Sequence, residues 1–175
     1  MENKLPPYMH RRHEALNKIH TKLLQKPELV KELFDFENSV HADLELSWIQ
    51  PEFQEKEIGG AKEYQVVIAK VKAGQTSDAH MHEVGASSFV VLGSKLGFPN
   101  PSNLIYRTGT FHFPSCDTTI DKEITCSEGL ELDIPSHQIH QFENKNNEDA
   151  FVLIVTHPTI SVEEGHEDIH FVLKK

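Results

Sequence analysis

The sequence has few arginines: of its 17 Lys and Arg residues, only Arg11, Arg12 and Arg107 are arginine. Asp and Glu number 27, so the formal net charge is −10. A protein that binds nucleic acid needs a basic face to neutralise phosphates, and binding to an anionic membrane surface needs one too. The charge balance therefore argues against both nucleic acid and membranes as partners.

Long apolar runs are also absent. No stretch approaches the roughly 18 consecutive apolar residues of a membrane-spanning helix, and the mean hydropathy of −0.44 is typical of a soluble protein. Residues 1–4 lead into no apolar signal core, so a cytoplasmic location is expected.

Cysteine is scarce. Cys116 and Cys126 lie ten positions apart, across a turn expected at residues 119–122, so they could face each other in a hairpin. In a cytosolic chain two free thiols are the favoured interpretation. No CxxC or Cys–His zinc pattern is present, so a closed structural zinc site is not predicted.

The sequence divides into a helical first part and a β-rich remainder. Apolar residues recur at helical spacing between residues 10 and 36, which predicts two short amphipathic helices with a break near residues 25–26. His10, His13 and His20 share that spacing and are interpreted as a solvated face. We therefore predict one domain with a helical extension over residues 1–41 and an all-β sandwich or barrel over 42–175. Its strands are expected at residues 44–49, 64–71, 88–92, 104–113, 130–134, 150–156 and 168–173.

Three histidines carry the strongest functional signal. A strand alternates its side chains between two faces, so His80 and His82 would point to the same side and could hold one metal ion. His140, from a distant strand, would complete a trigonal face and leave open positions for a substrate. The pattern predicts a catalytic metal centre at these three residues.

The surroundings of His80 and His82 resemble the first motif of the cupin superfamily, small jelly-roll barrels that bind a metal inside. That motif has Gly, five residues, His-x-His, three or four residues, Glu, six residues and Gly. This chain has Gly74, the two histidines and Gly93 in register, with Ala86 where the motif has Glu.

The surroundings of His140 are similar to the second cupin motif, which has Gly, five residues, Pro-x-Gly, two residues, His, three residues and Asn. Gly129, Pro135, His140 and Asn144 match this spacing, and His137 stands in place of the second glycine. The resemblance covers residues 62–158 and implies a double-stranded β-helix that follows the helical segment.

The resemblance implies that His80, His82 and His140 hold one divalent ion without the usual carboxylate of Glu. Three neutral imidazoles leave the ion its full +2 charge, which favours an anionic ligand such as a thiolate or enolate. Fe(II) is the favoured ion, and Ni, Mn and Zn are alternatives because imidazole suits several metals.

Within the cupins, a three-histidine site resembles those of cysteine dioxygenase and of related diketone- or gentisate-cleaving oxygenases. The implied function is a non-haem Fe(II) dioxygenase acting on O₂ and a small anionic substrate. Residues 140–144 are similar to the thiol dioxygenases' His-x-x-Glu-Asn. Where those enzymes have a Ser-His-Tyr relay, this chain has Val152, Ile154 and Thr156, and near the place of their substrate-binding arginine it has Gln54, so cysteine itself is not the expected substrate.

Two other functions stay open. A metal-dependent isomerase or lyase of a sugar or keto acid needs only Lewis acidity, and a non-catalytic cupin would sense or store a ligand or metal. Oxygen consumption separates the dioxygenase from both. A homodimer is also expected, since cupins commonly pair through their sheets, and residues 10–50 could pack at such an interface.

Two further residues are candidates for substrate binding. Arg107 is the one arginine of the barrel region and so the default anchor for an anionic substrate, with a surface ion pair as the alternative. His137 could be an extra ligand, an acid/base or a group supporting the ligands, or it could simply lie exposed at the rim.

Overall fold

The computed structural model describes residues 7–41, 44–58, 64–82, 85–157 and 169–171, which form two antiparallel sheets and a few helices. The helices are α1 (Pro7–Gln25), α2 (Leu29–Leu33), α3 (Pro51–Ile58) and the short 3-10 helix η1 (Ser94–Leu96). One sheet has six strands in the order β1 (Phe34–His41), β2 (Leu44–Ile49), β3 (Gln65–Val71), β10 (Ala150–His157), β5 (Ala86–Leu92) and β8 (Glu131–Ile134). The other has five, in the order β11 (Ile169–Phe171), β4 (Ala79–Met81), β9 (Ile139–Asn144), β6 (Leu104–His112) and β7 (Asp117–Cys126).

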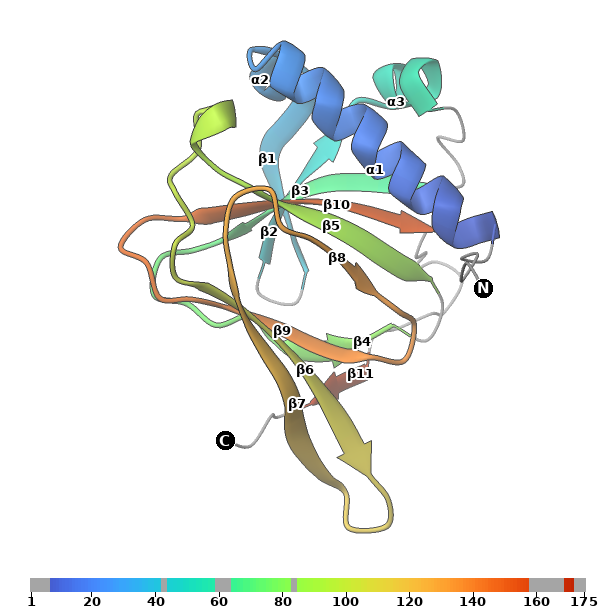
Figure 1. Cartoon of the computed structure of the whole chain (residues 1–175), viewed down its shortest axis with the longest axis vertical. Coiled ribbons are helices and arrows are strands. Elements are labelled where there is room, and N and C mark those ends of the chain that lie inside the picture. Colours follow the sequence, from blue (N-terminus) through green and yellow to red (C-terminus); the bar gives the residue numbers. More distant parts are fainter. Residues whose placement is uncertain (1–6, 42–43, 59–63, 83–84, 158–168, 172–175) are drawn as a thin grey trace, which may run out of the picture.

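The two sheets face each other as the walls of a barrel, and α1 crosses the outside of the six-stranded sheet (Figure 1). This architecture confirms the predicted all-β barrel with a preceding helical segment. Residues 34–41, which the sequence interpretation placed in the helical extension, form β1 and pair with β2. Helix α3 was not predicted.

Both faces of the six-stranded sheet are apolar, because one lines the barrel and the other receives the helices. In β3, Val67 and Ala69 belong to the cluster inside the barrel, whereas Val66 and Ile68 belong to the cluster beneath α1. Alternation along a strand produces this division. The interior cluster includes Phe89, Val91, Tyr106, Phe142 and Val152.

Helix α1 is held on the sheet by an apolar stripe. Leu16, Ile19 and Leu23 have no exposed surface and pack on the outer cluster. Burying each such side chain contributes roughly 1.5–3 kcal/mol. The helix therefore covers the outer face of β5 and β10. The expected homodimer stays a prediction.

A polar group also anchors α1, and we call Arg12, His13, Ser88 and Asp133 the α1 anchor. Arg12, only 1% exposed, donates from Nε to Ser88 Oγ at 2.8 Å and lies 3.6 Å from Asp133. Ser88 Oγ donates to Asp133 at 2.6 Å, and His13 Nε2 lies 2.9 Å from the same carboxylate. Burial alone would raise the pKa of Asp133, but the Ser88 hydrogen bond, His13 and the charge of Arg12 lower it below its usual value.

The structure corrects the interpretation of His13 and His20 as a solvated face, while the side chain of His10 lies outside the described part of the chain. His13 contacts Asp133. His20 is half-buried, and desolvation lowers its pKa although Glu131 and Glu128 oppose the shift. The spacing alone did not reveal that this side of α1 packs against the barrel.

Strands β6 and β7 form a long hairpin that projects beyond the barrel (Figure 1). Its turn lies at residues 113–116 and not at residues 119–122, so the two cysteines do not face each other. Cys116 is exposed at the tip, whereas Cys126 is buried in the interior cluster, where desolvation raises its pKa to about 11. Both thiols are free.

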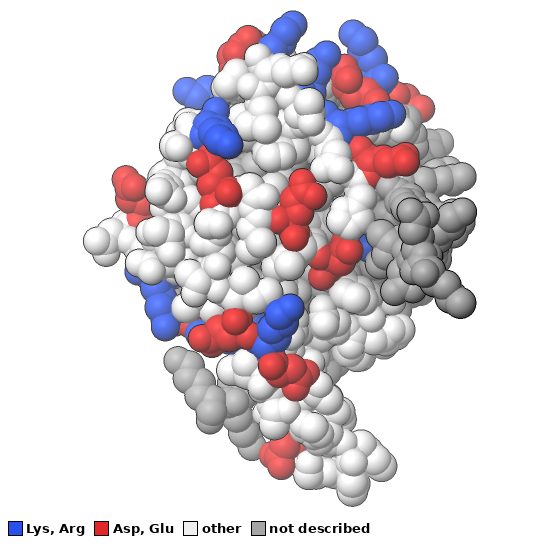
Figure 2. Space-filling model, viewed as in Figure 1, with Lys and Arg blue, Asp and Glu red and all other residues white. Residues whose placement is uncertain are grey.

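The visible surface carries acidic and basic side chains interspersed, with no single basic patch on that face (Figure 2). Within the described part of the chain, no helix combines the length and apolar character needed to cross a membrane.

Candidate metal centre

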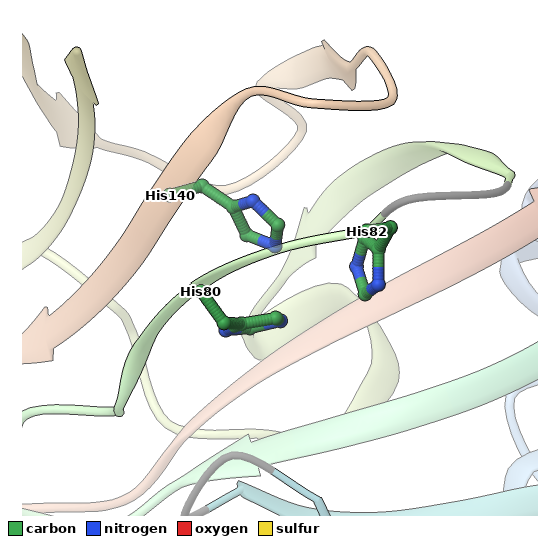
Figure 3. Close-up of side chains that lie close together, drawn as sticks. All are labelled: His80, His82 and His140. Carbon is green, nitrogen blue, oxygen red and sulfur yellow. The ribbon is translucent and has the colours of Figure 1, made fainter. Parts of the chain in front are cut away.

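Strand pairing brings the three predicted ligands together. His80 lies in β4 and pairs directly with His140 in β9, so the two side chains share one face of the sheet. His82, two residues after His80, extends to the same side. Figure 3 shows the three rings turned toward a common space, two from one strand and one from its neighbour.

The geometry fits one metal ion. His80, His82 and His140 are 4%, 7% and 3% exposed, and one nitrogen from each lies within 4.8 Å of the others. An ion about 2.1 Å from each nitrogen holds pairs of nitrogens roughly 3–4 Å apart, so ring shifts of less than about 1 Å would complete the set. Among the described residues this group contains imidazoles alone, with no carboxylate.

Two backbone carbonyls fix the protonation of these rings. His80 Nδ1 donates to the carbonyl of Asp78 at 3.0 Å, and His140 Nδ1 donates to the carbonyl of Gln138 at 2.8 Å. A carbonyl can only accept, so Nδ1 carries a proton in each ring, which leaves Nε2 as the nitrogen that can bind a metal. The carbonyls also hold the two rings in orientation.

His137 has a backbone role beside the site. Its amide donates to the carbonyl of His82 at 2.8 Å, which ties the loop before β9 to the end of the ligand strand. The residue has φ +64, the left-handed conformation that explains why the cupin motif has a glycine there. Its side chain is exposed.

Replacing His137 by glycine should leave metal binding intact and change the free energy of unfolding by less than about 1 kcal/mol, in the stabilising direction. Glycine relieves a left-handed conformation that costs other residues about 1 kcal/mol or more. Urea denaturation and metal analysis check this. The control His112→Gly, at an exposed strand residue with ordinary φ, should instead lose stability. Loss of the metal from His137→Gly would show that the side chain is a ligand.

In β5, Ser87 and not Ala86 faces the barrel interior. Side chains alternate along the strand, so Ser87 shares the inward face with Phe89 and Val91. Ser87 Oγ lies 2.8 Å from Thr156 Oγ1 on the neighbouring strand. A pair of buried hydroxyls thus stands at this level of the barrel. Glu83, the other acidic residue considered, lies outside the described residues.

Arg107 does not face the histidines. Its neighbours Tyr106 and Thr108 point inward, so its own side chain lies on the outer face of the five-stranded sheet. Its Nε donates to Glu123 at 2.6 Å and its Nη2 forms an ion pair with Glu143. Burial opposes the charge, but these carboxylates outweigh it and raise the pKa of Arg107. The placement agrees with the alternative interpretation of an ion pair, but Arg107 is buried and does not lie at the surface as that interpretation expected.

The position aligned with the substrate-binding arginine also lies away from the site. Gln54 is buried in α3, and its Nε2 donates to the carbonyl of Tyr64 at 2.7 Å. Among the buried described residues, the arginines are Arg12 and Arg107, both on outer faces of the sheets. The positive charge inside the barrel would thus come from the ion itself.

No family model matches the chain, and no curated protein matches it significantly. Among solved structures, capsular polysaccharide assembling protein CapF from Staphylococcus aureus aligns with a TM-score of 0.50 and 16% identity over 78% of this chain and 34% of that one. The chain thus spans about a third of CapF.

Two further solved structures align more weakly. Oxalate decarboxylase OxdC from Bacillus subtilis has a TM-score of 0.48 and 16% identity over 78% of this chain and 30% of that one. An uncharacterized protein with a double-stranded β-helix domain from Klebsiella pneumoniae has a TM-score of 0.41 and 16% identity over 62% and 70%. The chain therefore has the double-stranded β-helix fold, and this fold brings the histidines of both sequence motifs into one buried group.

Proposed function

We propose that the chain is a metal-dependent enzyme, and specifically a non-haem Fe(II) dioxygenase that acts on a small anionic substrate at His80, His82 and His140. The observation that carries the proposal is the ligand set: three buried imidazoles with no carboxylate in the group among the described residues. An Fe(II) ion held there would supply a +2 charge, open positions for ligands and the one-electron chemistry that oxygen activation requires.

The chain's own residues would orient and shield the reaction. The carbonyls of Asp78 and Gln138 hold two of the imidazoles in fixed orientations. Phe89, Tyr106 and Phe142 pack edge to face or tilted inside the barrel, with ring centroids 5.2 to 5.4 Å apart. An apolar surrounding of this kind would strengthen the attraction between the ion and an anionic substrate atom.

The positions of the arginines limit the class of substrate that this site could bind. Arg107 is committed to Glu123 and Glu143, so no arginine among the buried described residues is placed to bind a substrate carboxylate remote from the ion. We infer a substrate with a single anionic atom or group, a thiolate or enolate, that faces the histidines directly. An amino acid such as cysteine fits this arrangement poorly.

Oxygen uptake tests the proposal. Protein purified without a histidine tag is reconstituted anaerobically with Fe(II) and mixed with a thiol such as cysteamine or a β-diketone such as pentane-2,4-dione. We expect substrate-dependent oxygen consumption, which vanishes when Zn(II) replaces Fe(II) because zinc is not redox-active. Turnover of a sugar or keto acid by the zinc protein without oxygen consumption would favour the isomerase or lyase. Tight binding without turnover would favour a sensor or store.

A further inference from the structure

A row of polar residues crosses the wall of the barrel opposite the histidines. Thr156 in β10 pairs with Gln65 in β3 on one side and with Ser87 in β5 on the other. Residues paired across antiparallel strands share a face. The neighbours two positions further along these strands belong to, or pack against, the interior cluster, so the three polar side chains face the interior.

This row lies at the same end of the barrel as the histidines. Ser87 follows His82 by only five residues, and Ile134, which pairs with Ser87, precedes His140 by six. The backbone bond from His137 to His82 ties these two connections together. In the five-stranded sheet, His80, His140 and Thr108 form the matching row, also paired in register.

Gln65 provides the observation that favours ligand binding by this row of polar residues. Its Oε1 is buried and has no hydrogen-bond partner among the described residues, whereas Ser87 and Thr156 contact each other. A buried acceptor without a donor costs about 1–3 kcal/mol, and such an atom calls for an explanation. The interior cluster is mainly apolar, and no described residue donates to this oxygen, so a bound molecule with a hydroxyl or amino group would satisfy it.

We propose that Gln65 is a specificity-determining residue whose Oε1 accepts a hydrogen bond from a hydroxyl or amino group of the substrate. This inference rests on the proposed function and narrows it: the substrate carries an anionic metal-binding atom at one end and a hydrogen-bond donor at the other. A site built to bond a donor rejects an analogue that lacks it, because the buried acceptor is then left unpaired.

Two thiols of similar size test this inference. The probes are 2-mercaptoethanol and 1-propanethiol, which differ by a hydroxyl in place of a methyl group. Binding to the Co(II)-loaded protein is followed anaerobically by the cobalt–thiolate charge-transfer absorption, a readout independent of turnover. The wild-type protein should prefer 2-mercaptoethanol about tenfold, and Gln65→Met should reduce that preference several-fold while leaving 1-propanethiol binding nearly unchanged.

Controls separate the possible failures. Gln75→Met, at an exposed glutamine beyond the other end of β3, should keep the wild-type preference. Gln65→Asn keeps the amide but withdraws its oxygen, and should show an intermediate loss even if the methionine variant folds poorly. An unchanged preference in both Gln65 variants, or an equal loss for both thiols, overturns the role of Gln65. Failure of the wild-type protein to bind one Co(II) per chain would overturn the metal-dependent function itself, and the Gln65 proposal with it.

Discussion

The His140→Ala variant is expected to lose stoichiometric metal. His140 is the single proposed ligand from β9. Its pairing with His80 brings a third imidazole to the two on residues 80 and 82. Removing one of three ligands leaves a two-imidazole site, and even the loss of a group that only supports a ligand costs 10- to 100-fold in affinity. We therefore expect affinity to fall at least about 100-fold, with metal analysis giving close to one ion per wild-type chain and far less for the variant.

The control for this experiment is His112→Ala, which removes an exposed histidine that contacts Thr119 in the hairpin and lies outside the metal group. It should keep the wild-type metal content. One ion per chain retained by His140→Ala would contradict the site. Loss of metal from both variants would point to damage of the five-stranded sheet and not to loss of a ligand.

The grouping of the three histidines could be predicted from sequence because its geometry follows from local rules. Alternation along one strand places His80 and His82 on the same side, and the cupin spacing supplied His140. The spacing also located His137 at a glycine position, which the structure explains by its φ of +64.

Other parts of the site depended on strand register, which sequence does not specify reliably. The motif pointed to Ala86, but β5 turns Ser87 inward. The inward or outward direction of Arg107 was equally open until its pairing with Gln141 and its ion pairs with Glu123 and Glu143 placed it on the outer face.

The packing of α1 on the barrel could not be predicted from local sequence patterns. Arg12 lies in a polar N-terminal segment, and its partners Ser88 and Asp133 come from distant strands of the barrel. A period of 3.6 residues predicts a helix and an apolar stripe, but it does not identify a polar residue that becomes fully buried when the helix docks. The bounds of the predicted strands were more accurate than the packing of α1, because turn residues mark both ends of most of those strands.

Asp133→Asn should destabilise the protein by about 3 kcal/mol, the largest stability effect that we expect from removing a single charge. Asparagine can still accept the hydrogen bond from Ser88, so the change isolates the carboxylate charge. Arg12, 1% exposed, would then keep its positive charge with no carboxylate left among its partners in the described part of the chain. Removing one partner of a buried pair typically costs 3–5 kcal/mol, and we take the lower end because Asp133 itself is 26% exposed.

Urea denaturation at several pH values measures this effect. Since the folded protein lowers the pKa of Asp133, its contribution is complete above the usual value of 3.8 and disappears as the pH falls through the folded pKa below it. The difference between wild type and Asp133→Asn should therefore be constant near neutrality and shrink below about pH 4.

Two comparisons decide whether burial of Arg12 is the cause. Lys72→Met, which breaks the exposed pair with Glu45, should cost less than about 1 kcal/mol, because solvent screens surface pairs. Adding Arg12→Met to Asp133→Asn should recover part of the lost stability, since it removes the unpaired buried charge. If the free energy of unfolding of Asp133→Asn lies within about 0.5 kcal/mol of the wild-type value, Ser88 alone compensates the charge of the Arg12 guanidinium. Helix α1 would then be held on the barrel by Leu16, Ile19 and Leu23, and not by the anchor.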